Sequence, residues 1–174
     1  MKTILAWSEV WGILIPLTIL ILYKVKDREL KPVVLYVWIA VFLNIAGRIF
    51  AELWKAKLLH NMPSFLQNNL LFYNLHSVAR VLLFTWFITN TKLLQPFRLL
   101  RIIIPVYALL VLINFIFFEP VSTFSTRLYA VESILLLVLC ISFFLYSIKD
   151  ESDTIWMDHP AFIVATGVSL YAVS

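Results

Sequence analysis

Charged residues are scarce in this 174-residue chain, and so are cysteine and glycine. Only 14% of the residues are charged, whereas 62% are hydrophobic and the mean hydropathy is +0.93. Soluble domains contain about 25% charged and about 50% apolar residues, and one core of this size cannot bury the excess. The composition therefore excludes a soluble enzyme, a soluble nucleic-acid-binding protein and a disordered tail. It predicts an integral membrane protein that sits in the lipid bilayer.

The single cysteine, Cys140, lies within an apolar run, so the chain cannot form an internal disulfide. The histidines do not suggest a metal or haem site, because His60 and His159 lie at the ends of predicted helices and no ligand stands at a suitable spacing. The sequence also lacks the patterns His-Glu-x-x-His and Gly-x-Ser-x-Gly and any Gly-rich phosphate loop. We therefore expect no catalytic residues, no metal and no cofactor.

Long apolar segments recur along the chain, and short polar connections separate them. A membrane-spanning helix needs about 20 predominantly apolar residues. Five segments meet this requirement, and a sixth of about 24 Å continues to the last residue. We therefore predict an all-α polytopic transmembrane helical bundle, with five full spans and most of a sixth, that forms a single domain over residues 1–174. The predicted spans are residues 4–23, 33–54, 65–89, 102–118, 127–148 and 159–174.

The distribution of Lys and Arg predicts the orientation of the bundle. The connections 24–32, 90–101 and 149–158 carry eight of these residues, and the opposite side carries four. The positive-inside rule then places the N-terminus outside and these three connections in the cytoplasm. One more helix would complete a seven-helix bundle with its N-terminus out and its C-terminus in, so we expect a longer seven-helix parent. The same bias accounts for the net charge of +4 without a nucleic-acid partner.

Polar side chains at membrane depth are the main functional candidates, because each ionisable group there costs several kcal/mol unless it faces a partner or water. They recur at helical spacing in the second, third and fifth predicted spans, on faces that we expect to point into the bundle. Tyr107 and Asn114, seven residues apart, form a similar face in the fourth span. The candidate ligand-binding residues, which we expect to meet in the outer half of the bundle, are Asn44, Arg48, Tyr73, His76, Arg80 and Glu132.

The charges in this group do not balance by themselves. Two cations, Arg48 and Arg80, accompany one deeply placed carboxylate, Glu132, so Glu52, Glu9 or a bound anion has to complete the set. Arginine binds a carboxylate or a phosphate with two parallel hydrogen bonds, which favours a small anionic or amphipathic ligand. The alternative is that Glu132 pairs with one arginine only to hold helices together. For His76, the alternatives are an interior hydrogen-bonded histidine and a proton relay.

The segment from residue 132 to residue 171 carries a pattern of its own. Glu132 opens a Leu-rich helix, an acidic turn follows, and the segment ends with Asp158-His159-Pro160-Ala161-Phe162 and Gly167-x-x-Leu170-Tyr171. This pattern resembles a group of uncharacterised bacterial polytopic membrane proteins of about seven helices, in which Pro-x-Phe-Trp precedes Gly-x-Leu-x-Tyr. In this chain Ile163 replaces the Trp. The resemblance implies a multi-pass protein of the bacterial inner membrane in which Glu132, Pro160 and Gly167 are characteristic, and it implies no chemistry.

Three functions remain open at the level of the sequence. The first is a sensor or receptor-like module that binds a small ligand in the outer half of the bundle and signals to a separate membrane or cytoplasmic partner. The second is a small-solute or proton-coupled transporter in which His76 and Glu132 titrate. The third is a structural subunit whose charges hold a larger membrane complex together.

Overall fold

The structure is a computed structural model, and it is helical throughout its regular elements, which confirms the prediction of an all-α fold for the residues it describes. Those residues are 16–18, 21–22, 28–56, 69–91, 101–149 and 160–173. The elements with complete bounds are α3 (Lys31–Lys55), α4 (Leu70–Asn90), α5 (Ile103–Ile113), the π-helical segment η4 (Asn114–Phe118), α6 (Thr126–Lys149) and α7 (Pro160–Val173).

Three helices of the described residues, α3, α4 and α6, are long and apolar enough to cross a membrane. They correspond to the predicted spans 33–54, 65–89 and 127–148, although α4 begins only at Leu70. The segments Ile103–Phe118 and Pro160–Ala172 are apolar but shorter. The predicted span 4–23 lies almost entirely outside the described residues. The apolar helices fit an integral membrane protein, and a count of five or six spans stays a prediction.

Local chemistry explains where these helices begin. Pro32 and Pro160 lie in the first turns of α3 and α7, where a missing backbone N–H costs no hydrogen bond. Ser125 precedes α6, and its hydroxyl oxygen accepts a hydrogen bond of 3.3 Å from the backbone N–H of Leu128, as in an N-cap.

Helix α4 ends at Asn90, and the next residue, Thr91, has an extended backbone and a hydroxyl that donates to the Ile88 carbonyl at 2.7 Å. The end of the predicted span 102–118 differs from a regular α-helix. The Glu119 N–H donates to the Asn114 carbonyl at 2.9 Å, which closes a wider π-helical turn over η4.

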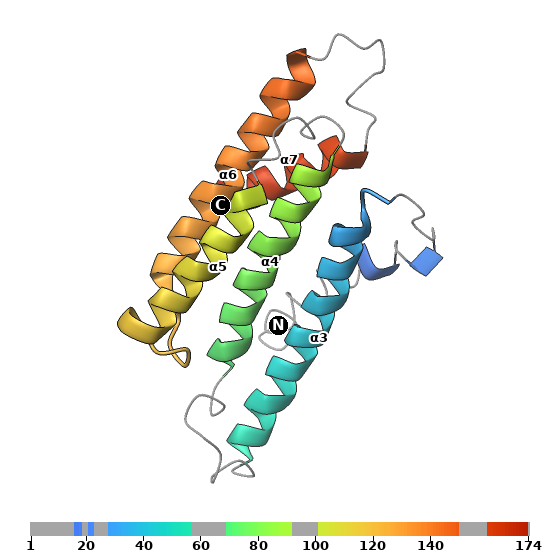
Figure 1. Cartoon of the computed structure of the whole chain (residues 1–174). Coiled ribbons are helices and arrows are strands. Elements are labelled where there is room, and N and C mark those ends of the chain that lie inside the picture. The colour runs from blue at the N-terminus through green and yellow to red at the C-terminus, as the bar shows by residue number, and fades with distance from the viewer. Residues whose placement is uncertain are drawn as a thin grey trace.

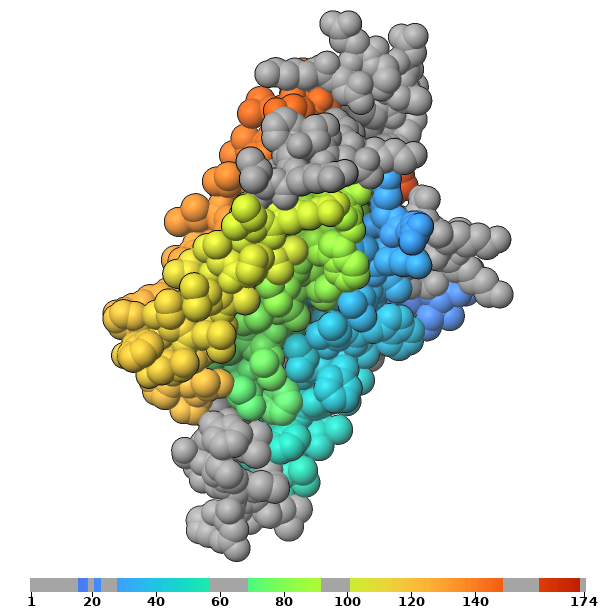
Figure 2. Space-filling model, in the orientation of Figure 1, coloured from blue at the N-terminus to red at the C-terminus, as the bar shows by residue number. Residues whose placement is uncertain are grey.

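Helix α4 lies in the middle of the arrangement. Figure 1 shows α3, α4, α5 and α6 side by side along one direction, with α7 crossing behind α4. In the space-filling view α4 is a green strip between α3, in blue and cyan, and α5, in yellow (Figure 2). The chain runs up α4 and up α6 in the same direction, whereas α3 runs antiparallel to α4 (Figure 1). A polar group on α4 can therefore reach several neighbouring helices.

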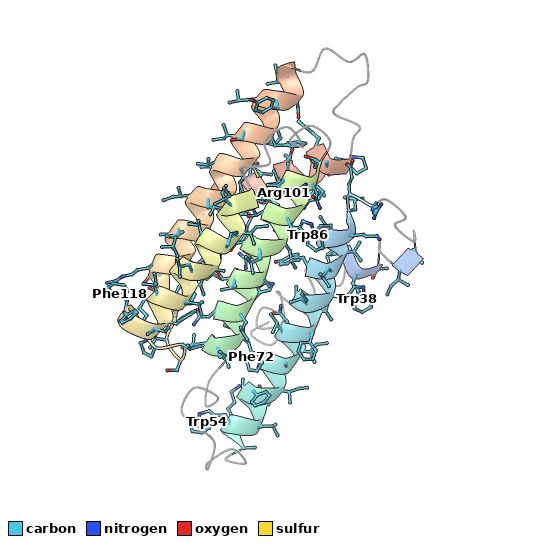
Figure 3. The ribbon with its side chains drawn as sticks, viewed as in Figure 1. Trp38, Trp54, Phe72, Trp86, Arg101 and Phe118 are labelled. Carbon is cyan, nitrogen blue, oxygen red and sulfur yellow. The ribbon has the colours of Figure 1, made fainter. Side chains whose placement is uncertain are left out.

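Aromatic and small residues pack these helices together. Gly47 of α3 lies against Phe72 of α4, where an added Cβ would approach the Phe72 Cβ to 3.2 Å. The Phe50 and Phe72 rings pack nearby, with centroids 5.3 Å apart, and Figure 3 shows Phe72 on the side of α4 that faces α3. The largest hydrophobic cluster joins α4, α6 and α7 through buried residues that include Phe87, Leu139 and Ala165.

Large apolar side chains cover the outer faces of the bundle. On α3 and α6 the exposed residues recur every three or four positions, so each helix presents a continuous apolar stripe to the outside. Figure 3 shows Trp38, Trp54 and Phe118 on the exterior. Soluble proteins rarely expose contiguous apolar surface on this scale, whereas a bilayer covers it. The stripes consist of Leu35, Trp38, Phe42, Ile45 and Ile49 on α3 and of Val131, Ile134, Val138, Ile141, Leu145 and Ile148 on α6.

Candidate functional site

The interior of the bundle contains one ion pair between described residues of different helices, α4 and α6. Arg80 Nη1 lies 3.0 Å from Glu132 Oε1, and the two side chains are only 7% and 0% exposed. Charged side chains this deeply buried are rare unless each has a partner. Of the two arginines considered as partners of Glu132, the structure pairs it with Arg80.

A second group on α4 binds the other carboxylate oxygen. The Ser77 hydroxyl donates a hydrogen bond to Glu132 Oε2, and Ser77 is itself buried. Ser77 lies three residues before Arg80, so both side chains project from the same face of α4 towards α6. Glu132 is therefore held by two groups from one helix, one of which is neutral.

His76 connects this ion pair to α3. Arg80 Nη2 lies 3.2 Å from His76 Nδ1, and His76 Nε2 lies 3.1 Å from the Tyr36 hydroxyl. Arginine can only donate, so Nδ1 is the acceptor, and a neutral imidazole then carries its proton on Nε2. The Nε2–H group donates to the Tyr36 oxygen in this tautomer. His76 is thus an interior hydrogen-bonded histidine that bridges α3 and α4.

Two more helices contribute tyrosines around Arg80. The guanidinium carbon of Arg80 lies 4.2 Å from the centre of the Tyr171 ring of α7, within the range of a cation–π contact. Tyr107 of α5 is fully buried, and its hydroxyl is within electrostatic reach of Arg80 and Glu132. Five helices therefore supply side chains around one guanidinium. We call this set the Arg80 cluster, and it comprises Tyr36, His76, Ser77, Arg80, Tyr107, Glu132 and Tyr171.

The order of the contacts determines what the Arg80 cluster can do chemically. His76 and Glu132 do not touch each other in the contacts described above, because Arg80 lies between them. A guanidinium keeps its proton in proteins, so it cannot pass a proton from one neighbour to the other. The arrangement is therefore suited to holding helices in a defined relation, and it is poorly suited to a direct proton relay between His76 and Glu132.

The described contacts of two other candidate residues, Arg48 and Asn44, lie within α3 and outside this cluster. Arg48 Nε is 3.8 Å from Glu52 Oε1 one turn further along α3, and these side chains are 32% and 55% exposed. Glu52 also accepts a hydrogen bond of 2.9 Å from Lys55. The Asn44 amide donates to the Ala40 carbonyl of its own helix at 2.8 Å. Tyr73 is half-buried on α4, four residues before Ser77.

The placement of these side chains also decides how their charges balance. Arg80 is paired with Glu132, and Arg48 is paired with Glu52, so each arginine has a carboxylate of its own. Of the three ways to complete the set that the sequence offered, Glu52, Glu9 or a bound anion, the structure contains the first. The charges of these residues therefore balance without a bound anion, and an anionic ligand stays a prediction.

A second buried polar network lies at the end of the bundle where α4 and α6 begin. The Asn74 amide donates to the carbonyls of Val121 and Thr123 at 2.9 and 2.8 Å, and its oxygen accepts from the Ser125 N–H at 3.4 Å. The Asn114 amide donates to the Ser125 hydroxyl at 3.1 Å. Asn74 therefore fixes the connection before α6, two turns from the Arg80–Glu132 pair.

Glu119 belongs to the rim of this network. Its carboxylate lies 3.6 Å from Arg127 Nε and accepts a hydrogen bond of 3.3 Å from Asn114. A hydrogen bond from Ser125, with smaller contributions from Asn114 and Arg127, lowers the pKa of Glu119 below its usual range. Glu119 is therefore a carboxylate at neutral pH.

Sequence reasoning missed three of the residues that make these contacts: Tyr36, Ser77 and Asn74. None of them is charged, and their partners are a histidine ring, a carboxylate on another helix and backbone carbonyls. By contrast, Tyr107 and Asn114 are buried as their spacing predicted. Within the described ranges, no three His, Cys, Asp or Glu side chains lie close enough together to hold a metal ion.

Comparison with known proteins adds no relative to this picture. No family model, no curated protein sequence and no solved structure matches the chain.

Proposed function

We propose that this chain is a multi-pass membrane sensor or receptor-like module, and that ligand binding acts by changing the contacts of the Arg80 cluster. The observation that carries the proposal is that one buried guanidinium touches two other helices and reaches a third. Arg80 contacts Glu132 of α6 and Tyr171 of α7, and its contact with His76 extends to Tyr36 of α3.

Such a centre supports signalling for a physical reason. A ligand shifts a conformational equilibrium only if it binds one helix arrangement better than another. A ligand group that displaces one of the contacts of Arg80 therefore changes how α3, α6 and α7 are held relative to one another. The exposed apolar stripes of α3 and α6 support placement in a bilayer, and we expect the output to pass to a separate membrane or cytoplasmic partner.

A structural subunit is the second candidate, and a specific observation favours it as well. The Arg80–Glu132 pair is internally neutral and nearly inaccessible, as expected for a contact that only joins helices. A proton-coupled transporter receives less support, because Arg80 lies between the two groups that would titrate.

The test uses the full chain purified in lipid nanodiscs. Native mass spectrometry identifies small molecules that remain bound, and thermal unfolding measures stabilisation when each is added back. For a sensor, we expect stabilisation of the wild type that is lost in Glu132→Gln and kept in the matched control Glu52→Gln. We also expect no flux of that molecule into liposomes.

Two results would contradict the sensor. Flux that requires Glu132 would indicate a transporter. The absence of any bound molecule, together with stoichiometric purification in a larger complex, would indicate a structural subunit.

A further inference from the structure

Two buried polar networks lie at different depths along α4, α5 and α6. The first, which we call the Asn74 network, lies at the end of the bundle where α4 and α6 begin, and in it Asn74 and Asn114 bind Ser125. The second is the contact of Ser77 with Glu132 in the Arg80 cluster. Both networks draw on α4, on α5 with η4, and on α6 with the residue before it.

The Asn74 network reaches the surface of the protein. Asn114 also donates to Glu119, and a carboxylate oxygen of Glu119 lies 3.6 Å from Nε of Arg127, whose side chain is 63% exposed. Thr123, whose carbonyl accepts another hydrogen bond of the network, is exposed as well. Water at this end of the bundle, where Figure 3 shows Phe118, is therefore in direct contact with residues of the network.

One apolar layer separates the two networks. On α6, Leu128 lies three residues after Ser125 and four before Glu132, so it occupies the same helix face between them. Val111 has the corresponding place on α5, four residues after Tyr107 and three before η4 begins. Leu128 and Val111 are buried in one hydrophobic cluster to which α4 also contributes. The layer therefore closes the path between the networks from all three helices.

The opposite side of the Arg80 cluster is closed over a much longer distance. Beyond Glu132, the next buried residue of α6 with a hydroxyl or charge is Ser147, and the buried residues between them are Leu136, Leu139, Cys140 and Phe143. At 1.5 Å per residue, Glu132 is about 22 Å from Ser147 along the chain but only about 10 Å from Ser125. The shorter path for water to Glu132 therefore starts at the Asn74 network.

Polar groups continue along α4 on both sides of the apolar layer. Asn74 and Ser77 lie three residues apart on one face of this helix. A water molecule that passes the layer therefore leaves hydrogen-bonding groups on one side and meets others on the far side. In membrane proteins, apolar constrictions between polar regions exclude water while closed and admit it when their side chains move apart.

We infer that Val111 and Leu128 form an apolar gate between the Asn74 network and Glu132, and that water enters the Arg80 cluster through this gate when it opens. Ionisable groups at membrane depth mostly face the bundle interior or a water-filled cavity, and the gate connects Glu132 to water from one end only. The inference goes beyond the proposed function, because it concerns the route into the Arg80 cluster and not the molecule that is sensed.

The experiment measures how fast introduced cysteines react with a small uncharged methanethiosulfonate in the full chain in lipid. The native Cys140 is replaced by alanine, and the variants Ser77→Cys and Thr85→Cys each add one cysteine. Both positions are 1% exposed on α4, but they lie on opposite sides of Arg80 along the helix. The thiolate is the reacting form, and burial in apolar surroundings suppresses it, so the rate reports the entry of water.

Two truncations of α6 distinguish the gate from the rest of the core. Leu128→Ala and Leu136→Ala each shorten a buried leucine four residues from Glu132, on opposite sides of it along the helix. Leu128→Ala should raise the reaction rate of Ser77→Cys by at least about tenfold, because truncating a buried leucine removes much of the packing that closes the layer. Leu136→Ala should leave this rate unchanged, and Thr85→Cys should react slowly in both backgrounds. Circular dichroism confirms that each variant is folded.

The inference is overturned if Leu136→Ala raises the rate of Ser77→Cys as much as Leu128→Ala does, or if neither raises it. It is also overturned if Thr85→Cys gains as much as Ser77→Cys in the Leu128→Ala background, because water would then enter without regard to the gate. Val111→Ala opens the same layer from α5 and replaces Leu128→Ala if that variant does not fold. The readout needs no ligand and no signalling partner, so its failure is distinguishable from failure of the sensor proposal.

Discussion

Helix α3 carries Arg48 and Glu52 four residues apart, and α4 carries His76 and Arg80 at the same separation. The two patterns have different surroundings in the folded chain. Arg48 and Glu52 contact each other along their own helix and remain partly exposed. His76 and Arg80 also contact each other, but both turn inward and bind groups on α3 and α6. The difference lies in the neighbouring helices and not in the spacing.

The position of each helix in the bundle explains this contrast. Helix α4 lies between α3 and α5 and also contacts α6, so most of its circumference faces protein (Figure 2). Helix α3 packs mainly on α4, and its other faces carry exposed apolar side chains. An ion pair within an exposed helix contributes about 0.3–0.5 kcal/mol, whereas removing one partner of a buried pair costs about 3–5 kcal/mol. The same four-residue spacing of ionisable residues therefore has a larger effect on stability in α4 than in α3.

The largest expected difference between the two regions comes from neutralising one carboxylate in each. Glu132→Gln leaves the Arg80 cation buried without its carboxylate, so we expect the free energy of unfolding to fall by about 3–5 kcal/mol. Glu52→Gln, the matched control, should lower it by less than about 0.5 kcal/mol. Reversible unfolding in mixed micelles measures both values. Equal losses of stability in the two variants would contradict the distinction between the buried pair of α4 and α6 and the partly exposed pair of α3.

Asn74 and Asn44 allow the same comparison to be made with uncharged side chains. Asn74→Leu removes three hydrogen bonds to the connection before α6, so we expect a loss of about 2 kcal/mol at roughly 0.5–1.5 kcal/mol per bond. Asn44→Leu removes one bond to a carbonyl of its own helix, and the change should stay within about 0.5 kcal/mol. The same unfolding assay distinguishes them. A larger loss of stability in Asn44→Leu than in Asn74→Leu would show that the Asn44 side chain makes contacts beyond its own helix.

The two described helical glycines test packing on each side of the bundle. Gly167 of α7 has open space where a Cβ would stand, so Gly167→Ala should stabilise the protein by about 0.5–1 kcal/mol through helix propensity. Gly47→Ala should give no such gain, because the new Cβ would press on Phe72 at 3.2 Å. Thermal unfolding of both variants measures the difference. An equal gain at Gly47 would contradict the close packing of α3 on α4.

The smallest expected effect concerns Glu119, which is half-buried at the rim of the Asn74 network. Its pKa is lowered in the folded state, so the carboxylate stabilises the fold above the ordinary Glu pKa of about 4.3. That contribution is lost as the pH falls through the lowered value, because the folded state must then take up a proton. The stability difference between wild type and Glu119→Gln should therefore be present at neutral pH and shrink on acidification. Unfolding curves recorded across this range measure it, and a difference that grows with acid would contradict the assigned contacts.

Much of the fold could be predicted from composition and hydropathy, because apolar runs of spanning length determine where helices form. The bounds of α3 and α6 differ by no more than two residues from the predicted spans 33–54 and 127–148. The π-helical end of the predicted span 102–118 could not be predicted. It depends on one backbone hydrogen bond between Glu119 and Asn114, which leaves no pattern in an apolar run.

The candidate site was predictable where charge is involved. Arg80 and Glu132 stand out because charges at membrane depth are rare, and the structure brings them together. Arg48 met the same criterion but lies outside the Arg80 cluster. This could not be predicted, because nothing in the sequence of its own helix reveals whether another helix covers that face. Ser77 and Tyr36 are polar residues of ordinary type, and only their three-dimensional neighbours give them a role.

The most direct test of the contrast is a pair of double-mutant cycles in the full chain in lipid. One cycle combines Arg80→Met with Glu132→Leu, and the other combines Arg48→Met with Glu52→Leu. The account predicts an interaction energy of at least about 2 kcal/mol for the buried pair and below about 0.5 kcal/mol for the pair on α3. Equal interaction energies in the two cycles would contradict it.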